Sequence, residues 1–121
     1  MARDEALEAW LREALRNERN VGEKAMFGGL AWLLNGHLQC ASREDGMLAR
    51  VGTERNAWAL ALSGVGPMVV RGRALDGWVR AAPPASVETR GRLLDAALAF
   101  VRSLPAKKDG ARARAPARRS W

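Results

Sequence analysis

The sequence has one cysteine, one histidine and no tyrosine among its 121 residues, and it has no long apolar run. A single cysteine excludes a disulfide within the chain, and no further cysteine or histidine is present to complete a zinc site. No stretch approaches the roughly 20 apolar residues of a membrane helix, and the N-terminus lacks the apolar core of a signal peptide. These absences predict a cytoplasmic protein with no membrane segment, no metal and no cofactor.

The net charge of +7 is concentrated at one end of the chain. Residues 105–121 carry six basic and one acidic side chain, whereas residues 1–104 carry 14 basic and 12 acidic ones. We therefore expect one domain over residues 1–104 and a disordered basic tail over residues 105–121, which lacks the apolar content to fold. The tail is either a solubilising terminus or a segment that contacts the phosphates of nucleic acid through Lys107, Lys108, Arg112, Arg114, Arg118 and Arg119.

Three segments are typical of helices. Apolar residues recur at spacings of three and four over residues 4–16, with Asp4 near the positive end of the helix. A short helix is expected after Thr53, which is placed to cap it. A long helix is expected from its cap at Ser86 to about Leu104, because Pro105 cannot continue it.

The segments between these helices are typical of strands. Asn35 and Gly36 predict a two-residue hairpin turn, which would pair Leu34 with His37, Leu33 with Leu38, Trp32 with Gln39 and Ala31 with Cys40. In that register one face carries Ala31, Leu33, Leu38 and Cys40, and the other carries Trp32, Leu34, His37 and Gln39. The first face is small and wholly apolar, so we expect the helices to cover it.

Further strands are expected over residues 47–51, 67–71 and 77–81. A turn at 43–46 precedes the first of them, and a loop bounded by Gly72 and Gly77 joins the other two. The polar residues 16–24 are expected to form a loop. The order α-β-β-β-α-β-β-α predicts an α+β two-layer sandwich, in which helices pack on one face of a mainly antiparallel sheet.

Reactive residues do not form a catalytic pattern. His37 and Cys40 lie three residues apart on a strand, which would place them on opposite faces, so we expect Cys40 in the core and His37 partly exposed. Gly28 and Gly29 precede a strand rather than a helix, so we interpret them as a bulge or a close approach of the chain, with Met26 and Phe27 turned inward, and not as a phosphate loop. No pair of carboxylates suited to acid-base chemistry is evident, so no enzymatic activity is expected.

Five short motifs, taken in order, resemble the N-terminal domain of the TfoX/Sxy proteins, regulators associated with competence for DNA transformation. They are KAMFGG at 24–29, NG at 35–36, LARVG at 48–52, GRALDGWV at 72–79 and SLPAK at 103–107. The resemblance covers residues 4–107 and implies a non-enzymatic α+β domain in a single-domain form. Its motif residues in this chain are Met26, Phe27, Gly28, Gly29, Gly72, Gly77 and Trp78.

The sequence favours a domain that acts through protein association. Leu30, Trp32 and Leu34 would form an apolar face opposite the helices, and Trp78 is expected on the same face. Such a face is too apolar to remain in water, so we expect a homodimer or another protein partner to cover it. The alternative function is that of a nucleic-acid-associated accessory protein that uses the basic tail.

Overall fold

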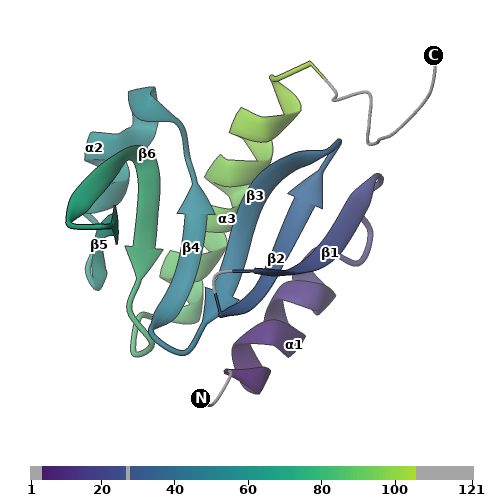
Figure 1. The fold of residues 1–121 in the computed structure, drawn as a ribbon, viewed down its shortest axis with the longest axis horizontal. Helices are drawn as coiled ribbons and strands as arrows, with labels where there is room; N and C mark the ends of the chain where they lie inside the picture. Colours follow the sequence, from purple (N-terminus) through teal and green to yellow (C-terminus); the bar gives the residue numbers. More distant parts are fainter. Residues whose placement is uncertain (1–3, 27, 106–121) are drawn as a thin grey trace.

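The computed structural model describes residues 4–26 and 28–105, which form a six-stranded antiparallel sheet with helices on one side (Figure 1). The strand order is β1-β2-β3-β4-β6-β5. The predicted α+β two-layer sandwich is confirmed, with one strand more than expected. The elements are α1 (Glu5–Ala14), β1 (Val21–Met26), β2 (Gly29–Leu34), β3 (His37–Arg43), β4 (Gly46–Arg50), the 3-10 turn η1 (Thr53–Arg55), α2 (Asn56–Leu60), β5 (Val65–Val70), β6 (Arg73–Ala81) and α3 (Val87–Arg102).

Capping residues define where the two longer helices begin. The side chain of Asp4 accepts a hydrogen bond from the amide of Leu7, and that of Ser86 accepts one from the amide of Thr89. Both satisfy amides that have no partner within their helix. The cap predicted at Thr53 is wrong, because Thr53 is itself the first residue of η1. The residue at the cap position is Gly52, which has no side chain to form a capping hydrogen bond.

Strand β1 was expected to be part of a loop. It pairs with β2 along its whole length, from Val21 opposite Leu34 to Met26 opposite Gly29. Its side chains are mostly exposed, because β1 lies at the edge of the sheet. The backbone pairing with β2 and the ion pair of Glu23 with Arg12 on α1 stabilise this polar strand. Its sequence lacks the alternation of apolar and polar residues from which a strand is predicted.

The hairpin formed by β2 and β3 contains the predicted turn but not the whole predicted register. Asn35 and Gly36 both have positive φ angles, 54° and 83°, as a type I′ turn requires. Leu34 pairs with His37 and Leu33 with Leu38, as expected. A bulge at Gln39 then shifts the register by one residue, so that Trp32 faces Cys40 and Ala31 faces Ala41.

This bulge corrects the prediction that His37 and Cys40 lie on opposite faces. Residues paired directly across an antiparallel ladder lie on the same face. His37 pairs with Leu34, Cys40 pairs with Trp32, and Leu34 and Trp32 lie two residues apart on β2, so His37 and Cys40 share a face. Cys40 is fully buried in the core beneath the helices, as expected for a small core residue.

The predicted interface of Leu30, Trp32 and Leu34 is also wrong. These side chains are only 8%, 2% and 2% exposed, and they belong to the core between the sheet and the helices. On β2 the helices cover the face with the larger side chains. These pack in one core with Leu7 and Leu11 of α1 and with Leu93 and Leu98 of α3.

The second long hairpin also differs from its prediction. Strands β5 and β6 are joined by the two-residue turn of Arg71 and Gly72, whose φ angles are 53° and 78°. Gly77 therefore lies within β6 and not at the end of a loop. Its carbonyl accepts hydrogen bonds from the amides of Val51 and Gly52, and its own amide donates to Asn56 Oδ1. The positive φ of 89° at Gly77 allows β6 to bend where it meets the chain that leaves β4.

Candidate interaction surface

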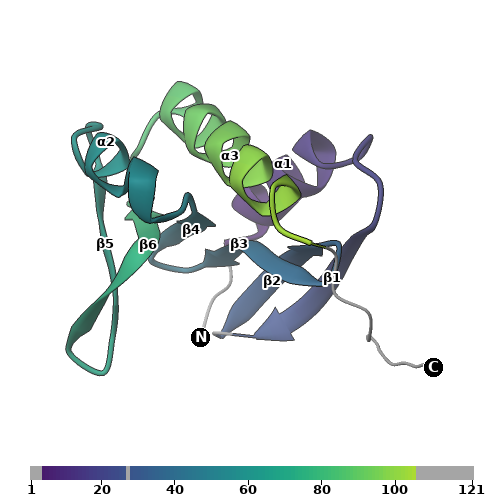
Figure 2. The same ribbon diagram turned by 90° about the horizontal axis from the view of Figure 1, so that it is seen from above.

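The sheet face opposite the helices carries a second, smaller apolar cluster. We call this side of the sheet the open face. Figure 1 looks onto it, and in Figure 2 the helices lie above the sheet while the tip of the hairpin of β5 and β6 projects below it. The cluster has a buried part, Ala31, Ala41, Leu48 and Met68, and a partly buried part, Met26, Leu38 and Trp78. No helix of the described residues covers these side chains, so the open face is the sheet surface available to another molecule.

The hairpin of β5 and β6 carries further exposed apolar residues. Val69, Val70 and Leu75 are 53%, 37% and 37% exposed, and all three lie near its tip. Figure 2 shows the tip projecting away from the helix layer. The apolar cluster and the hairpin tip therefore lie on the same side of the molecule.

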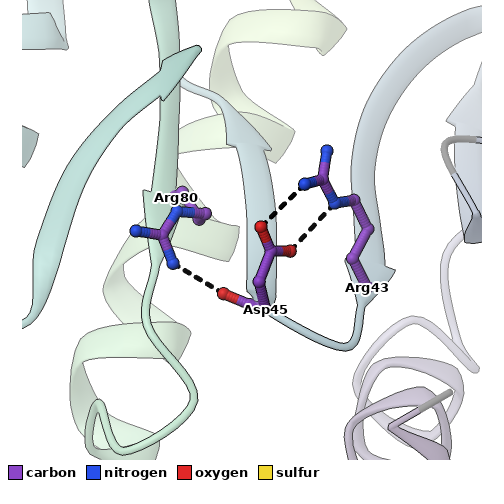
Figure 3. A network of polar contacts seen from close by, with 3 residues as sticks. All are labelled: Arg43, Asp45 and Arg80. Atoms are coloured by element: carbon purple, nitrogen blue, oxygen red, sulfur yellow. Dashed lines mark hydrogen bonds and ion pairs between the residues drawn. The ribbon is translucent and has the colours of Figure 1, made fainter. Parts of the chain in front are cut away.

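Three charged residues lie at one end of the open face. Nε and Nη2 of Arg43 donate to the two carboxylate oxygens of Asp45, at 2.9 and 2.7 Å. Nη1 of Arg80 donates to the backbone carbonyl of Asp45 at 2.6 Å. Figure 3 shows the two arginines approaching Asp45 from opposite sides. The carboxylate of Asp45 is thus bound by Arg43, while Arg80 contacts the main chain.

These residues line a hollow of about 270 Å³ between β4, β6 and β5. Its other walls are apolar, formed by Leu48, Pro67, Met68 and Val69. Leu48 and Met68 are also members of the open-face cluster, so the hollow is continuous with it.

A larger hollow of about 440 Å³ lies between η1 and α3. Arg55 and Phe100 line it. The guanidinium of Arg55 lies over the ring of Trp58, at 4.3 Å from its centroid, and that of Arg50 lies over the ring of Phe100, at 5.4 Å. Ala96, Ala99 and Gly52 are among its lining residues. Glu54 lines the same hollow as Arg55, so its walls carry charges of both signs.

The predicted motif residues do not form one site. Met26 and Trp78 both pack on the open-face cluster, so Met26 turns toward that face and not toward the core beneath the helices. Phe27 lies outside the described residues, as do the six basic residues predicted to contact nucleic acid. Gly29 has no room for a side chain, because a Cβ atom there would overlap the carbonyl of Ser42 on β3, whereas Gly28 has open space and a φ of 78°.

The histidine and the cysteine have separate environments. Burial raises the pKa of the Cys40 thiol from 9.0 to about 12, so the thiol stays protonated and is a poor nucleophile. His37 is half-buried, and its Nε2 atom contacts the carbonyl of Pro105 at 2.6 Å, at the end of the described chain. Within residues 4–26 and 28–105, no three His, Cys, Asp or Glu side chains are grouped as metal ligands.

Sequence reasoning missed the residues that give the open face its polar end. Arg43 and Arg80 are 37 positions apart and carried no motif, and Met68 was expected only as part of a strand. Leu48 of β4 pairs with Arg80 of β6, so the two side chains lie on the same face of the sheet. This could have been predicted only if the pairing of these two strands had been known.

The fold and this surface define an α+β protein with one helix-covered and one open sheet face. No family model, curated protein or solved structure matches this chain. None of the helices in the described part is long and apolar enough to span a membrane.

Proposed function

We propose that this chain is a non-enzymatic, cytoplasmic regulatory domain, of the kind that the TfoX/Sxy N-terminal domain represents, and that it acts by binding a protein through its open sheet face. The observation that carries the proposal is the apolar cluster of that face, which stays partly exposed at Met26, Leu38 and Trp78. Two of these residues, Met26 and Trp78, belong to the motifs on which the family resemblance depends.

The distribution of apolar surface supports this assignment. The helix-covered face is filled by residues of all three helices, so it offers no free surface. On the other side, the open-face cluster and the exposed Val69, Val70 and Leu75 on the hairpin combine buried apolar floor with exposed apolar rim. Apolar surface that gathers on one side of a small protein marks an interaction site more often than scattered apolar residues do.

The test is a double variant, Val69→Glu with Leu75→Glu, compared with the wild-type chain and with Val87→Glu as a control. Val87 is 60% exposed at the start of α3, so its substitution adds a carboxylate to the helix layer of the molecule. Association is measured by sedimentation velocity of the chain alone and by capture of proteins from an extract of the source cells. We expect wild type and Val87→Glu to associate with a copy or with a defined protein, and the double variant to lose that association. Indistinguishable behaviour of the double variant and wild type would refute the proposal.

A second candidate function is binding of nucleic acid through the basic tail. It is favoured by the six basic side chains against one acidic in residues 105–121. Phosphate contacts of this kind weaken steeply with salt and discriminate little between sequences. Fluorescence anisotropy with labelled DNA would compare the full chain with a variant in which the six residues are glutamine, and equal binding by both would eliminate this function.

A further inference from the structure

Arg80 and Arg43, the two arginines that line the hollow, differ in what they contact. Arg43 forms a bidentate ion pair with Asp45, whereas the hydrogen bond of Arg80 is to a backbone carbonyl. Among the described residues, no carboxylate pairs with Arg80 within 4.0 Å. The contact with Asp45 uses one N–H of a guanidinium that has five. The remaining donors are available to an acidic group that enters the hollow.

The hollow offers such a group an apolar surrounding. Leu48 and Met68, which are 0% and 2% exposed, form its floor together with Pro67 and Val69. A guanidinium beside apolar walls binds a carboxylate more strongly than one in open water, because the local dielectric constant is lower. The volume of about 270 Å³ admits an amino-acid side chain and excludes a folded element.

The charges around the open face distinguish between occupants. Lys24 pairs with Ala31 of the open-face cluster, Arg43 and Arg80 line the hollow, and Arg71 and Arg73 lie at the hairpin turn. In the segments that carry these arginines, Glu44 and Asp45 lie in the turn before β4, and Asp76 lies on β6. Basic residues are in excess, so a second copy would bring like charge to this surface. The apolar walls match a peptide better than a sugar-phosphate backbone, which has no apolar side chains to place there.

We propose that the hollow at Arg80 binds a carboxylate side chain from a short acidic and apolar peptide segment of another protein. The carboxylate is held by Arg80, and an apolar neighbour in the peptide packs on Met68 and Val69. This inference rests on the proposed function. It specifies what the partner presents, which is an aspartate or glutamate flanked by aliphatic residues.

The test uses a displayed library of random twelve-residue peptides, selected on the full-length chain. The enriched peptides are then synthesised with a fluorescent label, and their affinity is measured by anisotropy. We expect enrichment of Asp or Glu next to Leu, Ile, Val or Met. Arg80→Gln should weaken binding about tenfold or more, and so should replacing the peptide's acidic residue by its amide. Arg80→Lys keeps the positive charge but loses the two parallel donors of the guanidinium, so its affinity should lie between those of wild type and Arg80→Gln.

The control is Arg92→Gln, which removes the same charge from α3, where Arg92 is exposed, and should leave affinity unchanged. Failure to enrich acidic peptides, or undiminished binding by a correctly folded Arg80→Gln chain, overturns the inference. Displacement of the peptide by single-stranded DNA in an Arg80-dependent manner also overturns it, in favour of a phosphate ligand. Peptides without acidic residues that bind wild type and not the Val69→Glu and Leu75→Glu variant would leave the proposed function standing while refuting this inference.

Discussion

The two faces of the sheet are built from the same strands, but they are filled in different ways. Beneath the helices, the β2 side chains are the large Leu30, Trp32 and Leu34, whereas Ala31 of the same strand belongs to the open-face cluster. On β4 the sizes are reversed, because Ala49 belongs to the helix-covered core and Leu48 to the open-face cluster. The size of the side chains on one strand therefore does not identify the covered face.

The largest test of this comparison exchanges a tryptophan for a glutamate on each face. Trp32→Glu places a carboxylate in the closed core and removes a side chain that is 2% exposed. Truncation of a core tryptophan alone costs about 3–5 kcal/mol, and burial of an unpaired charge adds to this, so we expect no cooperative unfolding transition. Trp78→Glu should still fold, at a lower Tm, because Trp78 is partly exposed. Circular dichroism during thermal unfolding measures both. If Trp32→Glu folds as well as Trp78→Glu, the assignment of the faces is wrong.

The next test concerns the glycine pair before β2. In Gly29→Ala the new Cβ would overlap the carbonyl of Ser42, so β2 and β3 would have to separate, and we expect a loss of about 2–4 kcal/mol, at the upper end of ordinary substitutions. In Gly28→Ala the new Cβ has no atom within 4 Å, so the only cost is that of a φ of 78° in a residue with a side chain, on the order of 1 kcal/mol. Urea denaturation of both variants measures the difference. Equal losses would show that the close approach to Ser42 does not restrict Gly29.

A smaller effect in the opposite direction is expected at the bulge. Gln39 is fully buried, and neither its Nε2 nor its Oε1 atom has a hydrogen-bond partner in the described structure. Because an unsatisfied buried amide costs about 1–3 kcal/mol, Gln39→Met should raise the free energy of unfolding by about 1–2 kcal/mol. Val69→Met on the exposed hairpin is the matched control and should change stability little. Destabilisation by Gln39→Met would mean that the amide is needed at the bulge.

The smallest expected effect is an alkaline loss of stability that depends on Cys40. Burial raises the pKa of this thiol from 9.0 to about 12, so above pH 9 the unfolded chain releases a proton that the folded chain keeps. The contribution of the thiol is fully present below pH 9 and is lost as the pH rises toward 12. At pH 10 the loss is about 1 kcal/mol. Comparison with Cys40→Ala by urea denaturation at pH 8 and pH 10 isolates it, and an identical pH dependence in both chains would contradict it.

The sequence predicted those features that depend on local chemistry. The cap at Ser86, the position of Asp4 at the start of its helix and the Asn35-Gly36 turn are confirmed, because each is determined by a few neighbouring residues. The fold class followed from the order of the elements. The first two pairs of the hairpin register were also correct, since they depend only on the turn.

Features that depend on tertiary contacts could not be predicted. Nothing in the residues around Gln39 marks the bulge, and that single extra residue reversed the relation of His37 to Cys40. The choice of covered face depends on where α1 and α3 pack, which the strands do not reveal. The hollow at Arg80 requires the pairing of β4 with β6, two strands separated in the sequence by η1, α2 and β5.

The strand order has a further consequence for solubility. The edge strands of the sheet are β1 and β5. The unpaired backbone groups of an edge strand can form hydrogen bonds with a strand of another molecule, and repetition of this pairing produces a filament. Pro67, near the middle of β5, has no amide hydrogen to donate, and Glu23 and Lys24 place charges along β1. Both ends therefore resist addition of a further strand. Growth into filaments by edge pairing is therefore disfavoured.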